Sequence, residues 1–362
     1  DESGIDLLLA TTRHDVRYLS GGYFYHFHAL STRMGRTQYL PLVGIPRGRA
    51  DDAFYVGRAE ERGQIEAEGL WIPNFVEALR GTKSTAASAA AWIRRSGGAS
   101  RRIGVEMPFI PADAYLALRE ALPDAVLVDA TPLLDELRAV KSEAELAILR
   151  GVYSRVADSI GSTFRASGPG ETTRDIAARV ELEMAKRGVS FIFALVCAGP
   201  GYLRAPSGAR WEKGRALHID AGGTDRDYVA DICRMGCMGE PDALSRDLYD
   251  ACIAVQDQAR KAIRAGVRRW EVMESGLEAA RCSGFPESAR FVVHGIGMVP
   301  YEEPVFRPDD PRLLEAGMVL SVETDFRHPE VGHVKIEDAV IVREEGCEGL
   351  GDRGREWQIL SP

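Results

Sequence analysis

Residues 216–234 read ALHIDAGGTDRDYVADICR, and this stretch decides the fold. Two apolar, strand-like runs flank a centre rich in glycine and aspartate, which predicts a β-hairpin with its turn around Gly222 and Gly223. Asp220 and Asp231 stand inside the apolar runs, where an unpaired carboxylate is costly to bury. We therefore expect either that alternation along the strands exposes them to solvent, or that a positive group lies between them.

Three more polar residues stand in strand-like sequence further along the chain. His294 lies in FVVHGIG, Glu323 in VLSVETDF and Glu337 in VKIEDAVIV. The segment RHPEVG separates the two glutamates and predicts a second hairpin turn. Because side chains alternate between the faces of a strand, the two members of each acidic pair can point to one face.

Each of these residues has an ordinary explanation when it is taken alone. Aspartate favours turns, a histidine after two valines is usually a hydrogen-bonded core residue, and a glutamate beside an aspartate usually faces solvent. Taken together, four buried carboxylates and one imidazole repel each other unless ion pairs or metal ions neutralise them. This donor set suits Mn²⁺, Fe²⁺, Co²⁺ or Zn²⁺, and the number of carboxylates suits two ions that share bridging ligands.

The pattern of expected elements divides the chain at about residue 133. Strands alternate with helices in residues 1–133, for example in the strand-like GIDLLLATT and the helix-like STAASAAAWIRRSGG, which predicts an α/β domain. Residues 134–362 read helix, helix, strands, helix, helix, strands, so they predict a duplicated α+β unit. Ser142 followed by Glu145 predicts a capping box at the start of the first of these helices.

Composition limits the partners and the compartment. The net charge is −9 with both signs mixed along the chain, which disfavours nucleic acid and anionic membranes as main partners. No apolar run reaches the length of a membrane-spanning helix. The six cysteines are scattered in a chain too large to need a disulfide framework, so we expect a reducing, cytoplasmic compartment and buried thiols at Cys233 and Cys237.

The order Asp, Asp, His, Glu, Glu with these neighbours resembles the metallopeptidases of the pita-bread fold, which include methionine aminopeptidase, aminopeptidase P, prolidase and creatinase. The segments HIDAGGTDRDYVADICR, HGIGMVPYEEP, SVETDF and VKIEDAVIV are similar to the ligand strands of that family, and the first 133 residues resemble its creatinase/prolidase-type N-terminal domain. The resemblance implies an α+β protein whose pita-bread domain, residues 134–362, binds two divalent ions, with Mn²⁺ expected first and Co²⁺, Zn²⁺ or Fe²⁺ as alternatives. The metal ligands that it implies are Asp220, Asp231, His294, Glu323 and Glu337.

The same resemblance implies an activity. Asp231 and Glu337 would bridge the ions, and a metal-bridging hydroxide would attack an amide carbonyl while Glu323 carries the proton to the leaving nitrogen. The expected enzyme is a hydrolase of small peptides, an Xaa-Pro dipeptidase or an aminopeptidase P-like peptidase. Creatinase keeps the fold without the metal ligands, so the presence of all five argues against creatinase activity.

Two departures from the family pattern bear on the substrate. Tyr301 stands seven residues after His294, where family peptidases have a second histidine, so it is a candidate catalytic and substrate-binding residue. The loop AGPGYLRAPSGARW lacks another family histidine and offers Arg204 and Arg210, whose guanidinium groups suit a carboxylate unless they are solvated loop charges. His333 is a candidate substrate contact, with an exposed turn position as the alternative.

These departures keep other functions open. One is a non-peptidase that acts on a small carboxylated substrate, either a C–N hydrolase or an enzyme like dimethylsulfoniopropionate lyase with Tyr301 as base. Another is a scaffold protein without catalysis, which the five retained ligands disfavour. The resemblance also implies a homodimer in which the N-terminal domain lies near the partner's active site. The aromatic stretch from Tyr23 to His28 could close that pocket, and His26 and His28 are expected at a surface or interface.

Overall fold

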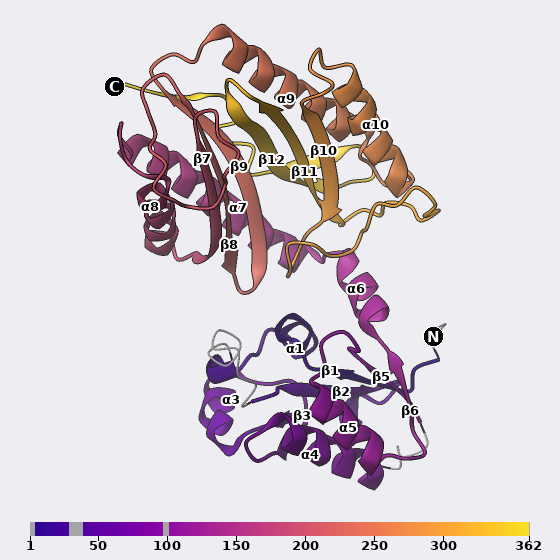
Figure 1. Ribbon diagram of the computed structural model, residues 1–362. Coiled ribbons are helices and arrows are strands. Elements are labelled where there is room, and N and C mark those ends of the chain that lie inside the picture. The colour runs from indigo at the N-terminus through magenta and orange to yellow at the C-terminus, as the bar shows by residue number, and fades with distance from the viewer. Residues whose placement is uncertain (1–3, 29–38, 97–100, 362) are drawn as a thin grey trace. The chain divides into compact units, whose positions relative to one another are not determined.

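The protein forms two compact units that divide between Leu137 and Arg138. The computed structural model describes residues 4–28, 39–96 and 101–361 (Figure 1). The division lies near the end of helix α6 (Thr131–Ala139) rather than after residue 133, because the helix runs through the position where the sequence predicts the boundary.

The first unit is the α/β domain that the sequence predicts. Its sheet has the order β4-β3-β2-β1-β5-β6, with parallel pairs β1–β5, β5–β6 and β3–β4. Leu9, Val56 and Ile103 of this sheet pack in one core with Ala86 and Ala90 of a helix, whose small side chains let it approach closely. Its elements are β1 (Leu7–Ala10), α1 (Arg13–Leu19), β2 (Leu42–Pro46), β3 (Phe54–Gly57), α3 (Arg62–Glu68), β4 (Asn74–Glu77), α4 (Thr82–Arg95), β5 (Arg102–Val105), α5 (Ala112–Ala121) and β6 (Val126–Asp129).

The second unit has the twofold order of elements that the sequence predicts. Two helices precede each set of three strands, and the strands join in one sheet of order β10-β11-β12-β9-β8-β7 (Figure 1). Its elements are α7 (Glu143–Ala166), α8 (Thr173–Lys186), β7 (Ser190–Ala198), β8 (Ala216–Asp225), β9 (Tyr228–Met238), α9 (Ala243–Ala262), α10 (Arg269–Arg281), β10 (Ala289–Gly295), β11 (Val319–His328), β12 (Gly332–Val342), β13 (Cys347–Leu350) and β14 (Gln358–Leu360).

Local sequence explains where the first helix of this unit begins. The Ser142 hydroxyl accepts a hydrogen bond from the Glu145 backbone N–H, and the Glu145 carboxylate accepts one from the Ser142 N–H at 2.8 Å. The predicted capping box is therefore confirmed. It satisfies N–H groups that have no partner within the first turn of α7.

The hairpin of residues 216–234 forms, but its turn differs from the prediction. The strands β8 and β9 connect through Arg226 and Asp227, whose φ angles are 50° and 67°. Two successive left-handed residues match the twist of a two-residue hairpin turn. Gly222 and Gly223 lie inside β8 instead. These strand positions require glycine, because a side chain at Gly222 would collide with the Phe193 ring and one at Gly223 with Val189.

The two faces of the C-terminal sheet differ in chemistry. Apolar side chains such as Val322, Val334 and Ile336 pack in one core with Leu248 and Val255 of α9. The residues that alternate with these apolar ones point to the opposite face, and they include the predicted polar residues Glu323 and Glu337. The helices therefore cover one face and leave the other to form a site.

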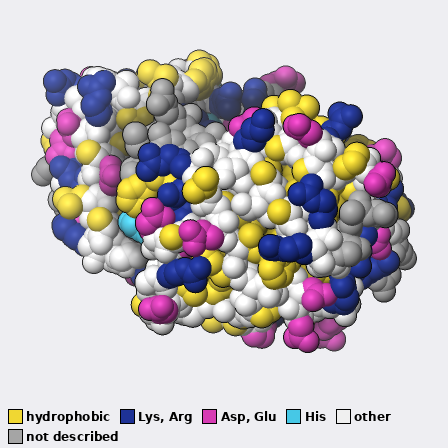
Figure 2. All heavy atoms as spheres, turned by 90° about the horizontal axis from the view of Figure 1, so that it is seen from below, with side chains coloured by type: hydrophobic (Ala, Val, Ile, Leu, Met, Phe, Trp, Pro, Cys, Tyr) yellow, Lys and Arg dark blue, Asp and Glu magenta, His cyan; other side chains and the backbone are white. Residues whose placement is uncertain are grey.

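The surface and the described helices add two observations. Figure 2 shows one face of the molecule on which Lys, Arg, Asp and Glu side chains are interspersed rather than gathered by sign. Across residues 4–28, 39–96 and 101–361, no helix is both long and apolar enough to cross a membrane.

Candidate metal centre

Strand register brings the predicted acidic residues into one row. Asp220 of β8 lies opposite Cys233 of β9, Cys233 lies opposite Glu337 of β12, and Glu337 lies opposite Glu323 of β11. Directly opposed residues project from the same face of a sheet. Asp231, two residues before Cys233, therefore shares this face.

The histidine joins the row from the neighbouring strand. His294 of β10 is paired with Ser321 of β11, two residues before Glu323. Its Nε2 lies 3.1 Å from Glu323 Oε1 and 4.0 Å from Glu337 Oε1. Ser321 Oγ donates a hydrogen bond of 2.7 Å to Glu337 Oε1 and fixes that carboxylate.

The donor atoms form two groups of the size that a metal ion needs. One oxygen from each of Asp220, Asp231 and Glu337 lies within 4.8 Å of the others, and the same holds for His294 with Glu323 and Glu337. Glu337 belongs to both groups. Asp220 Oδ1 and Asp231 Oδ1 are buried and accept no hydrogen bond from the described residues. Buried oxygens without a hydrogen-bond donor, beside an imidazole, fit divalent cations in this position.

The pKa values of the buried carboxylates shift in opposite directions. Burial, and then the neighbouring Glu337, raise the pKa of Asp231 well above its ordinary value. Burial and the charge of Glu323 raise the pKa of Glu337 to about 7. Burial alone would also raise the pKa of Glu323, but the hydrogen bond from His294 and the charge of Lys335 lower it to about 2. Crowded carboxylates behave in this way when they compete for a limited number of positive partners.

Two cations lie among the carboxylates, and the more buried one, Lys335, is not among the site residues predicted from the sequence. Lys335 Nζ lies 2.7 Å from Asp220 Oδ2, 2.7 Å from Glu323 Oε2 and 2.6 Å from Glu337 Oε2. Arg204, from the loop after β7, forms an ion pair with Asp220 Oδ2. The spacing in VKIEDAV was a usable signal, because Lys335 is two residues before Glu337 and must share its face.

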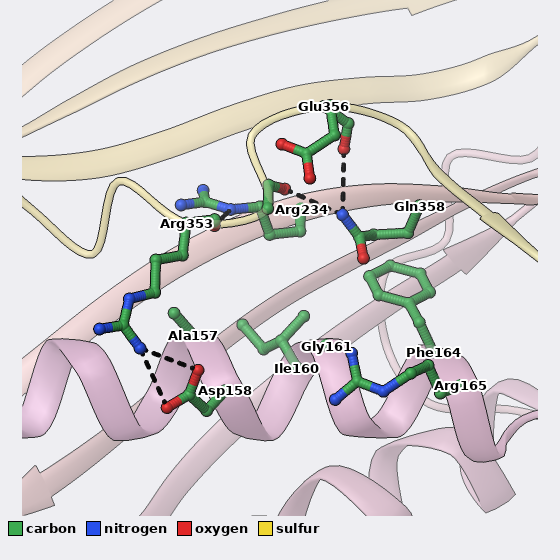
Figure 3. A pocket seen from close by; sticks show the side chains of 11 residues that line it. Ala157, Asp158, Ile160, Gly161, Phe164, Arg165, Arg234, Arg353, Glu356 and Gln358 are labelled. Atoms are coloured by element: carbon green, nitrogen blue, oxygen red, sulfur yellow. Dashed lines mark hydrogen bonds and ion pairs between the residues drawn. The ribbon is translucent and has the colours of Figure 1, made fainter.

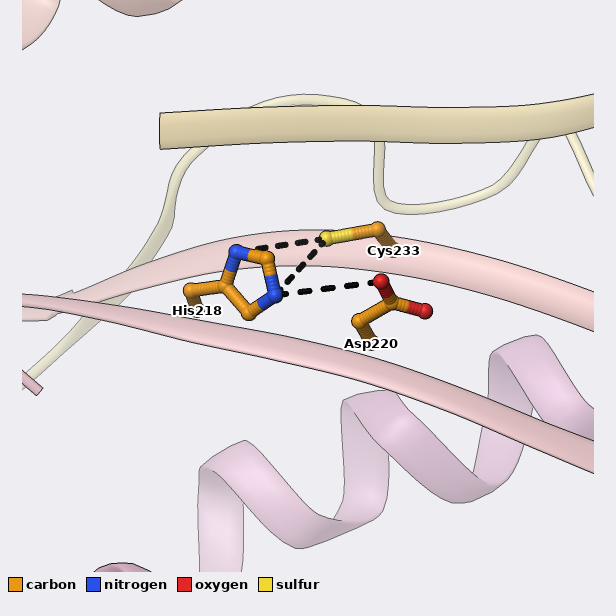
Figure 4. Close-up of side chains that lie close together, drawn as sticks. All are labelled: His218, Asp220 and Cys233. Carbon is orange, nitrogen blue, oxygen red and sulfur yellow. Dashed lines mark hydrogen bonds and ion pairs between the residues drawn. The ribbon is translucent and has the colours of Figure 1, made fainter. Parts of the chain in front are cut away.

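A second missed cluster lies directly beside Asp220. The ring of His218 is fully buried, with Nε2 at 3.9 Å from Asp220 Oδ2 and Nδ1 at 3.8 Å from Cys233 Sγ (Figure 4). Burial, and then His333, lower the pKa of His218 well below its ordinary value. The imidazole is therefore neutral and supports the wall of the site without adding charge.

An open cavity of about 360 Å³ gives access to the carboxylates. Its lining residues are Phe193, Leu195, Arg204, Asp220, Asp231, Pro300, Tyr301, Glu323, Lys335 and Glu337. The Tyr301 ring packs against His294 at a tilt of 33°, with 4.2 Å between ring centroids, and 69% of the residue is exposed. Partial burial, and then the charge of Glu323, raise the pKa of Tyr301 to about 12. The phenol is therefore a hydrogen-bond donor at neutral pH.

The remaining candidates lie elsewhere. His333 does not line this cavity, since it is 2% exposed, stacks on His218 at 4.6 Å between ring centroids and has Nε2 3.4 Å from Asp325. Arg210 is exposed and donates to the Gly170 carbonyl. The exposed position predicted for His28, at a surface or an interface, is wrong, because this residue is 3% exposed and lies 3.4 Å from the buried Glu61.

A smaller cavity of about 200 Å³ lies between α7 and the segment before β14 (Figure 3). Arg353 and Asp158 form an ion pair at 3.3 Å on its rim. Arg234 forms part of its wall and donates a hydrogen bond of 3.0 Å to the Glu337 carbonyl. None of the residues predicted as metal ligands or substrate contacts lines this cavity.

Known protein families match both units. A family model described as "Metallopeptidase family M24" matches residues 147–344, and one described as "Creatinase/Prolidase N-terminal domain" matches residues 1–140. The "Probable dipeptidase PepE" of Mycobacterium tuberculosis is 29% identical over 99% of this chain and 93% of its own length. The "Xaa-Pro dipeptidase" of Pyrococcus horikoshii is 23% identical over 98% of this chain and 95% of its own.

Solved structures share the fold over nearly the whole chain. The Xaa-Pro dipeptidase from Bacillus anthracis superposes with a TM-score of 0.85 at 24% identity, covering 99% of this chain and 96% of that one. The X-Pro aminopeptidase from Thermotoga maritima gives 0.84 at 22% identity, covering 99% and 100%. The second unit therefore has the pita-bread fold, preceded by a creatinase-type N-terminal domain.

Proposed function

Because this chain belongs to metallopeptidase family M24 and is a metal-dependent peptidase, we propose that it hydrolyses the Xaa-Pro bond of small peptides with two divalent ions. One observation carries the proposal: five side chains from β8, β9, β10, β11 and β12 converge on one face of the sheet, and the four carboxylates among them line a single cavity. The five are Asp220, Asp231, His294, Glu323 and Glu337.

The ligand roles follow from the donor groups. Asp220 and Asp231 would hold one ion, His294 and Glu323 the other, and Glu337 belongs to both groups. Mn²⁺ is the proposed metal, since carboxylates outnumber imidazoles in the set. Bound divalent ions supply Lewis-acid polarisation of a carbonyl and lower the pKa of a water molecule.

The chain's own residues supply positioning and proton transfer. Glu323 holds its carboxylate at the cavity wall and is hydrogen-bonded by His294, so it can accept a proton and return it to a leaving nitrogen. Tyr301 lies at the mouth over His294 and can donate a hydrogen bond to a substrate carbonyl. Phe193, Leu195 and Pro300 give the cavity an apolar side that suits a proline ring.

Arg204 favours a second candidate function, action on a small carboxylated substrate that is not a peptide. Its side chain lines the cavity, and its Nε is buried without a hydrogen-bond acceptor among the described residues. A guanidinium binds carboxylates through paired N–H groups. A C–N hydrolase or a lyase acting on such a substrate would use the same ligands.

A substrate screen separates the two functions. The metal-stripped protein would be loaded with Mn²⁺ or Co²⁺ and offered Xaa-Pro dipeptides, longer Xaa-Pro peptides and small carboxylated non-peptides, with products identified by mass spectrometry. Release of free proline, or of an N-terminal residue before proline, supports the leading proposal. Turnover of non-peptides alone would overturn it in favour of the second.

The proposal extends to the assembly and the compartment of the protein. We propose a homodimer in which the N-terminal domain lies near the partner's active site, which light scattering on the intact protein would test. We also propose a reducing, cytoplasmic compartment, because all six cysteines are free.

A further inference from the structure

Lys335 is the residue of the metal centre that the proposed function leaves without a role. Its side chain is 4% exposed, and its Nζ contacts carboxylates from three strands: Asp220 of β8, Glu323 of β11 and Glu337 of β12. Burial of an ammonium is costly unless negative groups surround it. Here three carboxylates surround it at hydrogen-bond distance.

The oxygens of the two glutamates divide between two sets of partners. Lys335 contacts Oε2 of Glu323 and Oε2 of Glu337, whereas His294 Nε2 lies 3.1 Å from Glu323 Oε1 and 4.0 Å from Glu337 Oε1. The ammonium therefore shares each carboxylate with the imidazole rather than displacing it. A divalent ion that used both oxygens of either glutamate would have to displace the ammonium.

Asp220 is in contact with two cationic side chains rather than one. Its Oδ2 contacts both Arg204 and Lys335, which leaves only Oδ1 without a partner. With all four ionised, as metal ligation requires, the carboxylates would carry four negative charges, and these two side chains supply two positive charges. An incoming ion therefore meets a cluster that the protein has already half neutralised, and it is repelled by charges of its own sign.

We propose that Lys335 is a built-in counter-cation, which holds the carboxylates together without metal and competes with divalent ions for them. This inference rests on the proposed function only in taking those carboxylates as metal ligands. Lysine suits the role because its compact charge sits on a flexible stem and can withdraw as an ion binds. The protein thereby keeps a folded metal-free state at the expense of metal affinity.

The test compares Mn²⁺ binding to the metal-stripped full-length protein and its Lys335→Met variant by titration calorimetry. The expected result is a dissociation constant lower by about tenfold or more in the variant, since a competing charge has been removed. The melting temperature of the metal-free variant should fall, and its rise on adding Mn²⁺ should exceed that of the wild type. Equal or weaker binding would overturn the inference.

Two further variants exclude a general packing effect. Lys335→Arg keeps the charge and should bind Mn²⁺ much as the wild type does. Lys141→Met removes another buried lysine, whose Nζ lies 2.8 Å from Glu302 outside the centre. It should lower the melting temperature and leave Mn²⁺ affinity unchanged. Tighter Mn²⁺ binding by Lys141→Met as well would contradict a specific role for Lys335.

The inference stays testable if metal-free Lys335→Met does not fold. The variant would then be purified with Mn²⁺ bound, and release to a chelator would be timed. Slower release than from the wild type supports competition, and equal or faster release overturns it. Failure of Xaa-Pro cleavage with tighter Mn²⁺ binding overturns the proposed function alone. Absence of Mn²⁺ binding in both proteins would overturn the metal centre and this inference together.

Discussion

Glu323 and Glu337 face each other directly across the β11–β12 ladder, and both point to the polar face of the sheet. Like charges placed directly opposite each other destabilise a sheet. Their pKa values separate, with Glu323 lowered to about 2 and Glu337 raised to about 7, because His294 and Lys335 favour the charge on Glu323 while Glu337 is deeply buried. Strongly separated pKa values cluster at functional sites, so this pair supports the metal centre that we propose.

Replacement of Glu323 by Gln should lower kcat by about 100-fold or more, because Glu323 is both a proposed metal ligand and the proposed proton carrier. Turnover of an Xaa-Pro dipeptide would be measured with saturating Mn²⁺, and circular dichroism would verify the fold. Glu330→Gln is the matched control, since Glu330 is exposed in the turn of the same hairpin. Full activity in Glu323→Gln would refute the role assigned to it.

Chelation should remove activity and lower the melting temperature, and Mn²⁺ should restore both. Ions that bind only the folded state stabilise it by about 2.7 kcal/mol when their concentration is 100 times the dissociation constant. Differential scanning calorimetry with increasing Mn²⁺ measures this gain. In Asp231→Asn the gain should be smaller, and a gain equal to that of the wild type would show that Asp231 is not a ligand.

Tyr301→Phe should reduce kcat/KM by about tenfold, which corresponds to the loss of one hydrogen bond to the substrate. The ring that packs against His294 is retained, so Mn²⁺ affinity should not change. Tyr202→Phe provides the control, because Tyr202 is an exposed tyrosine of the loop after β7 and does not line the cavity. If both variants keep wild-type kinetics, Tyr301 only lines the entrance.

Stability of the N-terminal domain should depend on pH through Glu106. Burial, and then contact with Asp15, raise the pKa of Glu106 from 4.5 to about 7. Between these values the folded state holds a proton that the unfolded chain releases, so the free energy of unfolding falls as pH rises from 4.5 to 7, by roughly 3 kcal/mol. Glu106→Gln should abolish this dependence, as urea denaturation of the full chain at both pH values would measure. An unchanged slope would place the titrating group elsewhere.

Loss of Arg234 should destabilise the second unit by about 3–5 kcal/mol, because the buried Asp338 loses its buried partner and keeps only the more exposed Arg355, at 3.2 Å. Arg234 is 2% exposed, forms an ion pair with Asp338 and donates to the carbonyls of Cys233 and Glu337. Thermal unfolding of Arg234→Met, Asp338→Asn and the double variant forms a cycle. The double variant should be more stable than the sum of the single effects predicts, and strict additivity would show that the pair is not coupled.

The sequence by itself determined the two domains, the strands that carry the acidic residues and the identity of the polar set. Apolar runs interrupted by Asp220, Asp231, His294, Glu323 and Glu337 are local features, and hairpins bring close only residues that are near in sequence. The capping box at Ser142 is equally local, and it was predicted correctly.

Only the tertiary structure decided which hairpins are neighbours and what lies between them. The pairing of Cys233 with Glu337 joins the two halves of the sheet and is long-range in sequence, so no local pattern specifies it. The same pairing brings Lys335 beside Asp220 and leaves His333 buried against His218 rather than at the cavity. The physical reason is that strand order and register follow from packing over the whole domain, which local preferences do not contain.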